Sequence, residues 1–276
     1  MSPMYLFFFV FLVIPAIGVV WWSTQSGGLI AGSKYVGLDN FTGLPKEPLA
    51  LTAVRNTLVF AVLSIPPTIV LALGIAILLS RVERGGATYR FLVYFPVLVP
   101  GVVAGLIWIF LTNVDFGLFN TILRLLGARP ITWLGASTAL PVLAAIDVWR
   151  NVGYWSIFFL AGIIGLPKEL FQAAELDGAG ALQRFRHLTI PLLRRILLFA
   201  VVVSTIWGLQ VFDTPVILTD GGPGTSTVTV VYQVWRYALG STYQAGLAAT
   251  ISLALLAVIL VLTAVQVRAL RGRETA

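Results

Sequence analysis

Residues 166–192 read LPKELFQAAELDGAGALQRFRHLTIPL, a polar stretch between two segments apolar enough to cross a bilayer. Pro167 suits the first position of a helix, where a backbone N–H has no partner in any case. Gly178 suits the left-handed turn that ends a helix. A second short helix is predicted to follow and to be limited by Pro191. The stretch is therefore predicted to be a hairpin of two short helices that faces water at a membrane surface.

The composition of the whole chain is that of a membrane protein. Hydrophobic residues make up 58% of the 276 residues and charged residues 11%, with a mean hydropathy of +0.95. A soluble domain of this length has too little interior to bury so much apolar side chain. The net charge of +7 needs no nucleic acid to explain it, since basic residues concentrate on the cytoplasmic side of membrane proteins. The absence of cysteine and the single His187 exclude disulfides, thiolate metal sites and multi-histidine sites.

Six segments are long enough to span, because a helix needs about 20 mostly apolar residues to cross a hydrocarbon layer of ~30 Å. They are residues 4–22, 56–79, 91–111, 140–164, 196–218 and 245–267. None alternates apolar and polar residues as barrel strands do. The first segment has no basic residues before it and no small-residue cleavage site after it, so we expect a retained helix. The predicted fold class is all-α: a polytopic membrane bundle of six transmembrane helices in one domain, residues 1–276.

Basic residues between the predicted spans set the orientation. One set of connections carries Arg81, Arg84, Arg90, Lys168, Arg184, Arg186, Arg194, Arg195, Arg268, Arg271 and Arg273. The opposite set carries Lys34, Lys46, Arg55, Arg124, Arg129 and Arg236. The richer set is expected in the cytoplasm, which puts both termini and the hairpin inside the cell. An amphipathic segment at residues 117–127 is expected at the outer membrane surface.

Polar residues inside the spans need an explanation, because a charge at the bilayer centre costs about 2.5–3.5 kcal/mol on insertion scales. Asp147 and Arg150 sit three residues apart on one helix face, where they either form a structural ion pair or let Arg150 face a water-filled path. Asn151 and Tyr154 continue that helix and supply hydrogen-bonding groups for cargo.

The fifth predicted span offers a second set of polar groups. Ser204, Trp207 and Gln210 bring hydroxyl, indole and amide groups within roughly three turns, and an indole face suits the apolar side of a sugar ring. Serine and threonine in membrane helices also bond their own backbone, so a structural role for Ser204 and Thr205 stays open. Prolines at 66, 67, 96 and 100 are expected to loosen the second and third spans, either as moving kinks or as static bends.

The hairpin carries a resemblance to a known family. The spacing of Gln172-Ala173-Ala174, Gly178 and Leu188-Thr189-Ile190-Pro191 resembles the EAA motif of bacterial ABC importer permeases, especially the carbohydrate-type branch. Gln172 stands where the family has Glu, and Leu188 and Ile190 stand where the family has Ile and Leu. Three further stretches add to the resemblance: YVGLDNF at 35–41, DVWRNVGY at 147–154 and LTDGGP at 218–223. The last is similar to a loop of the maltose-type and glycerol-3-phosphate-type first permease.

The resemblance implies a type I importer permease, a subunit of a bacterial cytoplasmic (inner) membrane transporter of sugars. Its implied partners are a second permease, two ATPase subunits, an external solute-binding protein and the lipid bilayer. The residues implied to couple to the ATPase are Gln172, Ala173, Ala174, Asp177, Gly178, Ala179, Phe185 and Pro191. The residues implied to line the substrate path are Arg150, Asn151, Tyr154, Ser204, Trp207, Gly208 and Val211, and Gln210 is added from its chemistry.

No catalytic, cofactor or metal site is expected on this chain. Residues 221–227 are glycine-rich but lack the Lys of a phosphate-binding loop, so ATP and Mg are expected on partner subunits. A secondary transporter with Asp147 or Asp213 as its coupling carboxylate is the main alternative, but it leaves the hairpin unexplained. A membrane-embedded enzyme would need clustered His, Asp or Glu near an interface. A hairpin that simply lies on lipid is a further alternative, which Arg184 and Arg186 suit.

Overall fold

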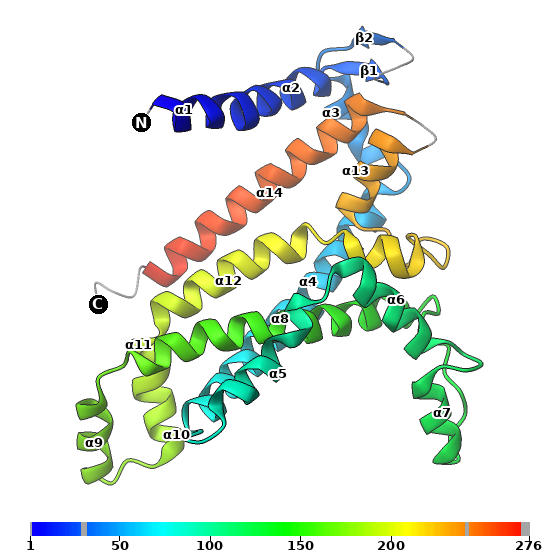
Figure 1. Ribbon diagram of the computed structural model, residues 1–276. Helices are drawn as coiled ribbons and strands as arrows, with labels where there is room; N and C mark the ends of the chain where they lie inside the picture. Colours follow the sequence, from blue (N-terminus) through cyan, green and yellow to red (C-terminus); the bar gives the residue numbers. More distant parts are fainter. Residues whose placement is uncertain (1, 29–31, 241–242, 272–276) are drawn as a thin grey trace. The chain divides into compact units, whose positions relative to one another are not determined.

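The computed structural model describes residues 2–28, 32–240 and 243–271, and these are almost entirely helical (Figure 1). The first elements are α1 (Ser2–Phe8), η1 (Phe9–Val13), α2 (Ile14–Ser23), β1 (Gln25–Gly27), β2 (Ser33–Tyr35), α3 (Asp39–Gly43) and η2 (Leu44–Lys46). The central ones are α4 (Ala50–Ser80), α5 (Gly86–Leu98), α6 (Gly101–Thr112), α7 (Leu118–Leu125) and α8 (Ala139–Ile164). Then follow α9 (Lys168–Leu176), α10 (Ala181–Arg184), η3 (Phe185–Thr189), α11 (Ile190–Leu192), α12 (Arg194–Leu209), η4 (Pro215–Thr219), α13 (Val230–Leu239) and α14 (Ala245–Arg271).

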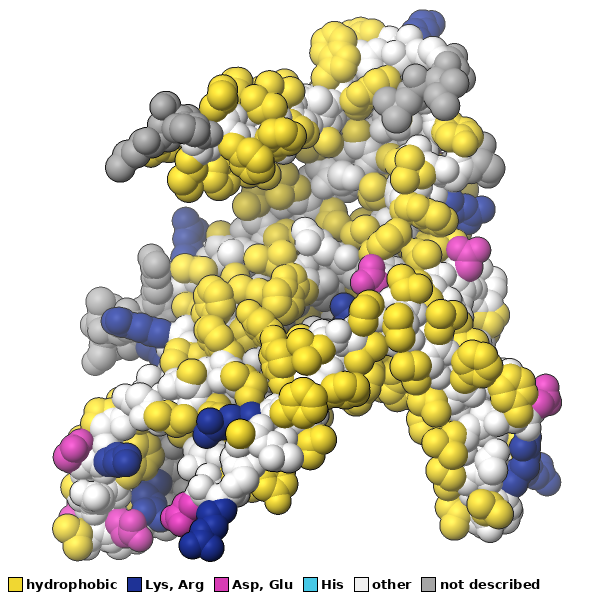
Figure 2. Space-filling view, viewed as in Figure 1, with side chains coloured by type: hydrophobic (Ala, Val, Ile, Leu, Met, Phe, Trp, Pro, Cys, Tyr) yellow, Lys and Arg dark blue, Asp and Glu magenta, His cyan; other side chains and the backbone are white. Residues whose placement is uncertain are grey.

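The helices suit the predicted membrane architecture. Among the described residues, three helices are long and apolar enough to cross a membrane, and up to six when each of three bent helix pairs counts as one span. Large apolar side chains stay exposed along these helices, as Phe7 (61%) and Leu106 (51%) do, and Figure 2 shows them covering much of one face. Such a surface is stable only where lipid or another apolar partner covers it.

Two of the predicted spans are interrupted. The segment at residues 91–111 is split between α5 and α6, which meet at 93° around Pro100, because a proline restricts the preceding residue, Val99, to extended backbone. The predicted helix at 196–218 was also too long, since α12 ends at Leu209. Pro215 then begins η4, because its ring and missing N–H prevent a continuous helix through that point.

The paired prolines of the second span do not break it. Pro66 and Pro67 lie inside α4, which is one helix of 31 residues. The hydroxyl of Thr68 donates to the Ser64 carbonyl oxygen at 2.7 Å, one turn earlier in the same helix.

The described chain forms two compact units. The first contains Met1–Val59, Leu134–Leu140 and Leu209–Leu262, and the second contains Phe60–Trp133, Pro141–Gly208 and Thr263–Ala276. Both α4 and α14 contribute residues to each unit. The prediction of a single permease domain over residues 1–276 stays a prediction.

The core of the second unit lies where α4, α8 and α12 meet. Small residues, Ala72, Ala76 and Ala200, are fully buried there and let the helix backbones approach, as in other membrane proteins. Trp155 and Phe159 of α8 fill the remaining space with rings that are at most 1% exposed. This packing fixes the height and rotation of the polar residues that share α8 and α12.

In the first unit, the start of α4 packs on α13 and α14. Its core cluster contains Ala53, Val230, Tyr232 and Ile251. The strands β1 and β2 form a two-stranded antiparallel hairpin with Gln25 opposite Tyr35. Neither this hairpin nor α13 was predicted from the sequence, because both lie in connections with no spanning length.

Candidate functional site

The polar hairpin exists, and its turn is at the predicted glycine. Gly178 has a φ of +79°, and Ala179 N–H returns to the Ala174 carbonyl oxygen at 2.8 Å to close the end of α9. After the turn, Gly180 N–H donates to Gln183 Oε1 at 2.9 Å and starts α10. A left-handed φ costs a residue with a side chain roughly 1–2 kcal/mol, so glycine is the residue best suited to this turn.

Pro191 does not end the second helix as predicted. The helical stretch continues through η3 and α11 to Leu192, and only then bends by 70° into α12. The reason is the π-helical register of η3, in which Ile190 N–H bonds to the Phe185 carbonyl oxygen. Pro191 therefore stands where the hydrogen-bond register changes, and its missing N–H removes little.

The outer face of the hairpin is polar and yet carries bare apolar side chains. Leu176 is 90% exposed and Leu182 is 77% exposed, while Gln172 and Ala173 are also exposed. A cluster of charged side chains covers the hairpin at the lower left of Figure 2.

The predicted coupling residues occupy three different places. Ala174, Asp177, Gly178 and Ala179 line a shallow cavity of about 380 Å³ in the turn of the hairpin. Phe185 points inward and packs against the core of α4, α8 and α12. The Phe185 ring therefore connects the hairpin to these three helices, so a movement of the hairpin would be passed on to them. Pro191 is exposed further along the second helix.

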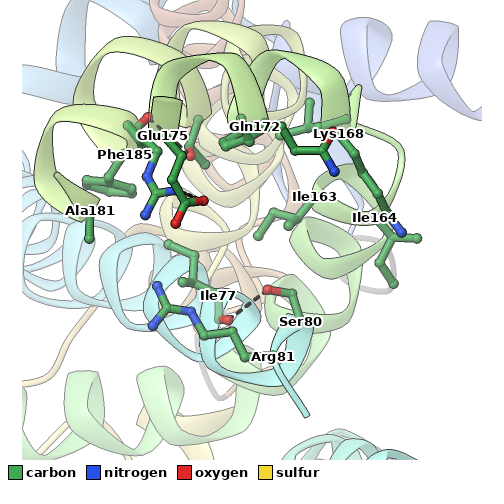
Figure 3. A pocket seen from close by; sticks show the side chains of 14 residues that line it. Ile77, Ser80, Arg81, Ile163, Ile164, Lys168, Gln172, Glu175, Ala181 and Phe185 are labelled. Atoms are coloured by element: carbon green, nitrogen blue, oxygen red, sulfur yellow. Dashed lines mark hydrogen bonds and ion pairs between the residues drawn. The ribbon is translucent and has the colours of Figure 1, made fainter. Parts of the chain in front are cut away.

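A cleft of about 730 Å³ lies beneath the hairpin, between α9, α10 and the ends of α4 and α8 (Figure 3). Arg184 of α10 reaches across it and donates to Glu175 of α9 at 2.7 Å. This ion pair joins the two arms of the hairpin. No sequence pattern pointed to the cleft, because its walls come from four separate elements.

Four of the predicted substrate-path residues come together inside the second unit. Asn151, Ser204, Trp207 and Gly208 line one small cavity of about 20 Å³ between α4, α8 and α12. Tyr154 lies beside it, with its ring centroid 5.5 Å from that of Trp207. These groups offer an amide, a hydroxyl and aromatic faces around a space large enough for about one water molecule.

The serine and threonine of α12 have different roles. Thr205 Oγ1 donates to its own helix at the Val201 carbonyl oxygen, 2.8 Å away, and accepts from Gln266 Nε2 at 2.9 Å. Thr205 therefore has the structural role that was left open from the sequence, since its hydroxyl is used within the fold. Ser204 Oγ is buried and has no hydrogen-bond partner among the described residues, so its hydroxyl is available for a solute or water.

The cavity has lining residues that were not predicted as part of a path, and some predicted path residues do not line it. Thr68 and Asp147 also line it, and Asn151 Nδ2 donates to Asp147 Oδ1 at 2.9 Å. Arg150, Gln210 and Val211 are not among its lining residues, and their place in a path stays a prediction. The helical spacing of Asn151 and Asp147, four residues apart, was a signal that could have paired them.

The YVGLDNF stretch forms a tie in the first unit. Asn40 Nδ2 donates to two carbonyl oxygens, those of Ser23 and Gln25, each at 2.8 Å. The end of α2 and the start of β1 are thereby held to α3. Gly246 of α14 lies so close to the Gln25 carbonyl oxygen that a Cβ would collide with it.

The Gly-Gly-Pro loop is held from several sides within the same unit. Tyr232 OH donates to the Asp220 carbonyl oxygen at 2.8 Å, and Thr227 Oγ1 donates to the Gly222 carbonyl oxygen at 2.9 Å. Asn56 Nδ2 of α4 donates to the Thr225 carbonyl oxygen at 2.9 Å. Burial, and then the hydrogen bond with Asp220, raise the pKa of the Tyr232 hydroxyl, so this group stays a donor. The loop is a fixed element of the first unit's surface.

Residues 68–272, which include both the hairpin and the small cavity, match the family described as binding-protein-dependent transport system inner membrane component. The chain belongs to this family of transport permeases. It is a multi-pass inner membrane protein, and its membership favours the importer interpretation over the secondary transporter. The family match begins after the YVGLDNF stretch, so it rests on the spans and the hairpin.

Curated relatives cover nearly the whole permease. It is 31% identical over 267 residues to the trehalose/maltose transport system permease protein MalF of Thermococcus litoralis, covering 96% of this chain and 90% of the relative. It is 36% identical over 248 residues to the sn-glycerol-3-phosphate transport system permease protein UgpA of Brucella abortus biovar 1, covering 87% and 82%.

A solved structure matches the fold. The permease superimposes with a TM-score of 0.83 on a chain of a bacterial ABC transporter involved in the import of the acidic polysaccharide alginate. The match covers 98% of this chain and 93% of the other at 23% sequence identity, and it shows a shared fold. The prediction of an all-α fold of the importer permease type is confirmed, with the short strands β1 and β2 as an addition.

Proposed function

We propose that this chain is a permease subunit of an ATP-driven, binding-protein-dependent importer of sugars, carrying an oligosaccharide or a glycerol-phosphate-like solute. The observation that carries the proposal is the exposed hairpin of α9 and α10, whose inner ring, Phe185, packs on the cores of the spans. The names of the relatives, which transport trehalose/maltose and sn-glycerol-3-phosphate, support the solute class.

In this proposal the hairpin receives force from a separate ATPase subunit. Ala173 and the exposed Leu176 form the contact face, Gln172 lines the cleft beneath it, and Gly178 gives the turn its shape. A push on α9 passes through the Glu175–Arg184 ion pair to α10 and through Phe185 to the spans. The chain then shifts between two packings, as transporters of alternating access do.

The solute path is proposed to run past the small cavity of the second unit. Asn151 and Ser204 would hydrogen-bond to solute hydroxyls, and Trp207 and Tyr154 would stack on a sugar ring. Gly208 keeps the wall free of side chain. Arg150, Gln210 and Val211 are retained as further path residues, and Arg150 would suit a phosphorylated polyol.

The proposed assembly contains a second permease, two ATPase subunits that bind ATP and Mg, and an external solute-binding protein. The chain itself is proposed to bind no cofactor and to catalyse no reaction. The two termini and the hairpin are proposed to lie in the cytoplasm of a bacterial cell, in agreement with the excess of basic residues on those connections.

Membrane-sided labelling and uptake test the proposal together. The chain has no cysteine, so Ala173→Cys introduces a single thiol on the exposed face of α9. A membrane-impermeant maleimide should label it in inside-out vesicles and not in intact spheroplasts, and ATPase subunits encoded nearby should protect it. ATP-dependent uptake of maltose or glycerol 3-phosphate by the reconstituted assembly should accompany this. Labelling from the exterior would overturn the orientation and the coupling role.

A further inference from the structure

The cleft beneath the hairpin collects positive charge from three separate elements. Fourteen residues line it. The basic ones are Arg81, which follows the end of α4, Lys168, the first residue of α9, and Arg184, the last residue of α10. Figure 3 shows Arg81 and Lys168 at opposite ends of the cleft, with Ile77 and Ile163 between them.

The charges of the cleft do not balance within its walls. Glu175 is the one carboxylate among the fourteen lining residues, and Arg184 already holds it at 2.7 Å. Arg81 and Lys168 are exposed and face the cleft without a second carboxylate in its lining. Lys168 also begins α9, where the positive end of the helix dipole adds to its charge. The cleft therefore favours an anion.

The remaining wall is apolar and continuous with the membrane-spanning helices. Ile77 of α4 and Ile163 and Leu166 at the end of α8 are half-buried against the hydrophobic core. Beside them Ile164 is 61% exposed and lines the same cleft. The apolar wall thus opens onto a surface that acyl chains would cover. An occupant that satisfies the cleft must combine an anionic group with hydrocarbon.

We propose that this cleft binds an anionic phospholipid, with the phosphodiester near Lys168 and the first part of an acyl chain along Ile164, Ile163 and Ile77 toward Arg81. A free phosphate would use only the cations and leave the apolar wall exposed. Basic pockets between membrane helices on the cytoplasmic side commonly hold anionic headgroups. The assignment to the inner leaflet rests on the proposed orientation, whereas the binding itself does not.

The bound lipid would act at the joint between the hairpin and the spans. The cleft has walls from α9 and α10 on one side and from α4 and α8 on the other. A phospholipid held there would brace the hairpin against the ends of the spans. Loss of the lipid is therefore expected to lower solute-stimulated ATP hydrolysis by the assembly while leaving its subunits associated.

Lipid retention by the purified assembly tests the proposal. The assembly is placed in nanodiscs of phosphatidylcholine with about one-fifth phosphatidylglycerol carrying a photoreactive acyl chain, and the crosslinked peptides are mapped. We expect crosslinks to residues 77–81 and 163–168. Lys168→Gln, alone and together with Arg81→Gln, should reduce them about fivefold, since a cation near an anionic headgroup contributes about 1 kcal/mol to binding. Arg84→Gln removes an equal charge three residues beyond Arg81, outside the cleft lining, and should leave them unchanged.

A variant that should increase crosslinking, and a competing anion without an acyl chain, complete the test. Glu175→Gln removes the competing carboxylate and should increase crosslinking. An excess of inorganic phosphate should leave the crosslinks in place, because it lacks the acyl chain. Equal crosslinking in the double variant and the wild type would overturn the proposal, as would displacement by inorganic phosphate or crosslinks confined to the ATPase subunits. Equal solute-stimulated ATP hydrolysis in nanodiscs with and without phosphatidylglycerol, together with no crosslinks to residues 77–81 or 163–168, would overturn the lipid site and leave the proposed transport function intact.

Discussion

The ring of Tyr154 on α8 lies 5.5 Å from the ring of Trp207 on α12, with an angle of 59° between the two planes. The pair lies beside the small cavity that Asn151 and Ser204 also line. Trp207 remains 45% exposed, although its neighbour Trp155 is almost fully buried. An aromatic pair with one exposed face beside polar groups is well suited to a sugar ring.

Trp207→Ala should lower uptake of solute without loss of assembly. The substitution removes the exposed indole face, and loss of a stacking contact with the solute worth about 0.5–1.5 kcal/mol corresponds to roughly a two- to twelvefold fall in uptake. Initial uptake rates in vesicles measure it, and co-purification of the partner subunits checks assembly. Trp207→Phe should recover most of the rate, and Trp21→Ala, an exposed indole on α2, serves as the control. Unchanged uptake would make Trp207 a packing residue.

Gly178→Pro should uncouple ATP hydrolysis from transport. Gly178 has a φ of +79°, which proline cannot adopt because its ring fixes φ near −65°. We expect the assembly to retain ATP hydrolysis while uptake falls at least tenfold. Gly180→Ala is the matched control in the same hairpin, since Gly180 has a φ of −67° and tolerates a side chain. Parallel losses in both variants would argue against a specific need for the left-handed turn.

Gly153→Ala should destabilise the second unit. A Cβ at Gly153 of α8 would collide with the Val93 carbonyl oxygen of α5, and a backbone atom cannot move aside as a side chain can. Overpacking of this kind costs about 1–3 kcal/mol, so the melting temperature should fall by several degrees. Differential scanning fluorimetry in detergent measures it. Gly74→Ala in α4 has open space around its Cβ and should be neutral or slightly stabilising.

Asn40→Asp should loosen the connection between α2 and α3. The substitution keeps the size of the side chain but removes the donors to the Ser23 and Gln25 carbonyl oxygens, at a cost of about 1–3 kcal/mol. Faster limited proteolysis between the two helices is the expected result. Thr42→Val removes a weaker local bond to the Asp39 carbonyl oxygen and should change the cleavage rate little. Equal rates in all three proteins would mean that Asn40 is not a tie.

The purified chain alone should show no ATP hydrolysis. Residues 221–227 form the glycine-rich loop of the chain, and they carry no Lys to hold a phosphate group. A coupled-enzyme assay on the isolated permease measures this, with the complete assembly as the positive control. Hydrolysis that persists through a second purification step and follows the permease would contradict the assignment of ATP to partner subunits.

The features that the sequence predicted correctly are those that local chemistry controls. The apolar length of α4 and α14 predicts membrane spans, and Gly178 predicts the left-handed turn, because each depends on a few neighbouring residues. The sequence alone does not predict which proline interrupts its helix. Pro66 and Pro67 remain within α4, whereas Pro100 separates two helices at 93°, and the sequence around each proline looks equally apolar.

The amino-acid sequence by itself therefore determined a helical membrane protein with a water-facing hairpin, since apolar length, basic-residue bias and glycine backbone freedom act over short distances. The tertiary structure alone decided that Thr68 of α4 shares a cavity with Ser204 of α12, and that Arg81 shares a cleft with Lys168. It also decided that Thr205 is used within the fold while the hydroxyl of Ser204 is left for a solute or water. These relationships arise from the packing of helices far apart in the chain, where small buried residues set how closely the backbones approach.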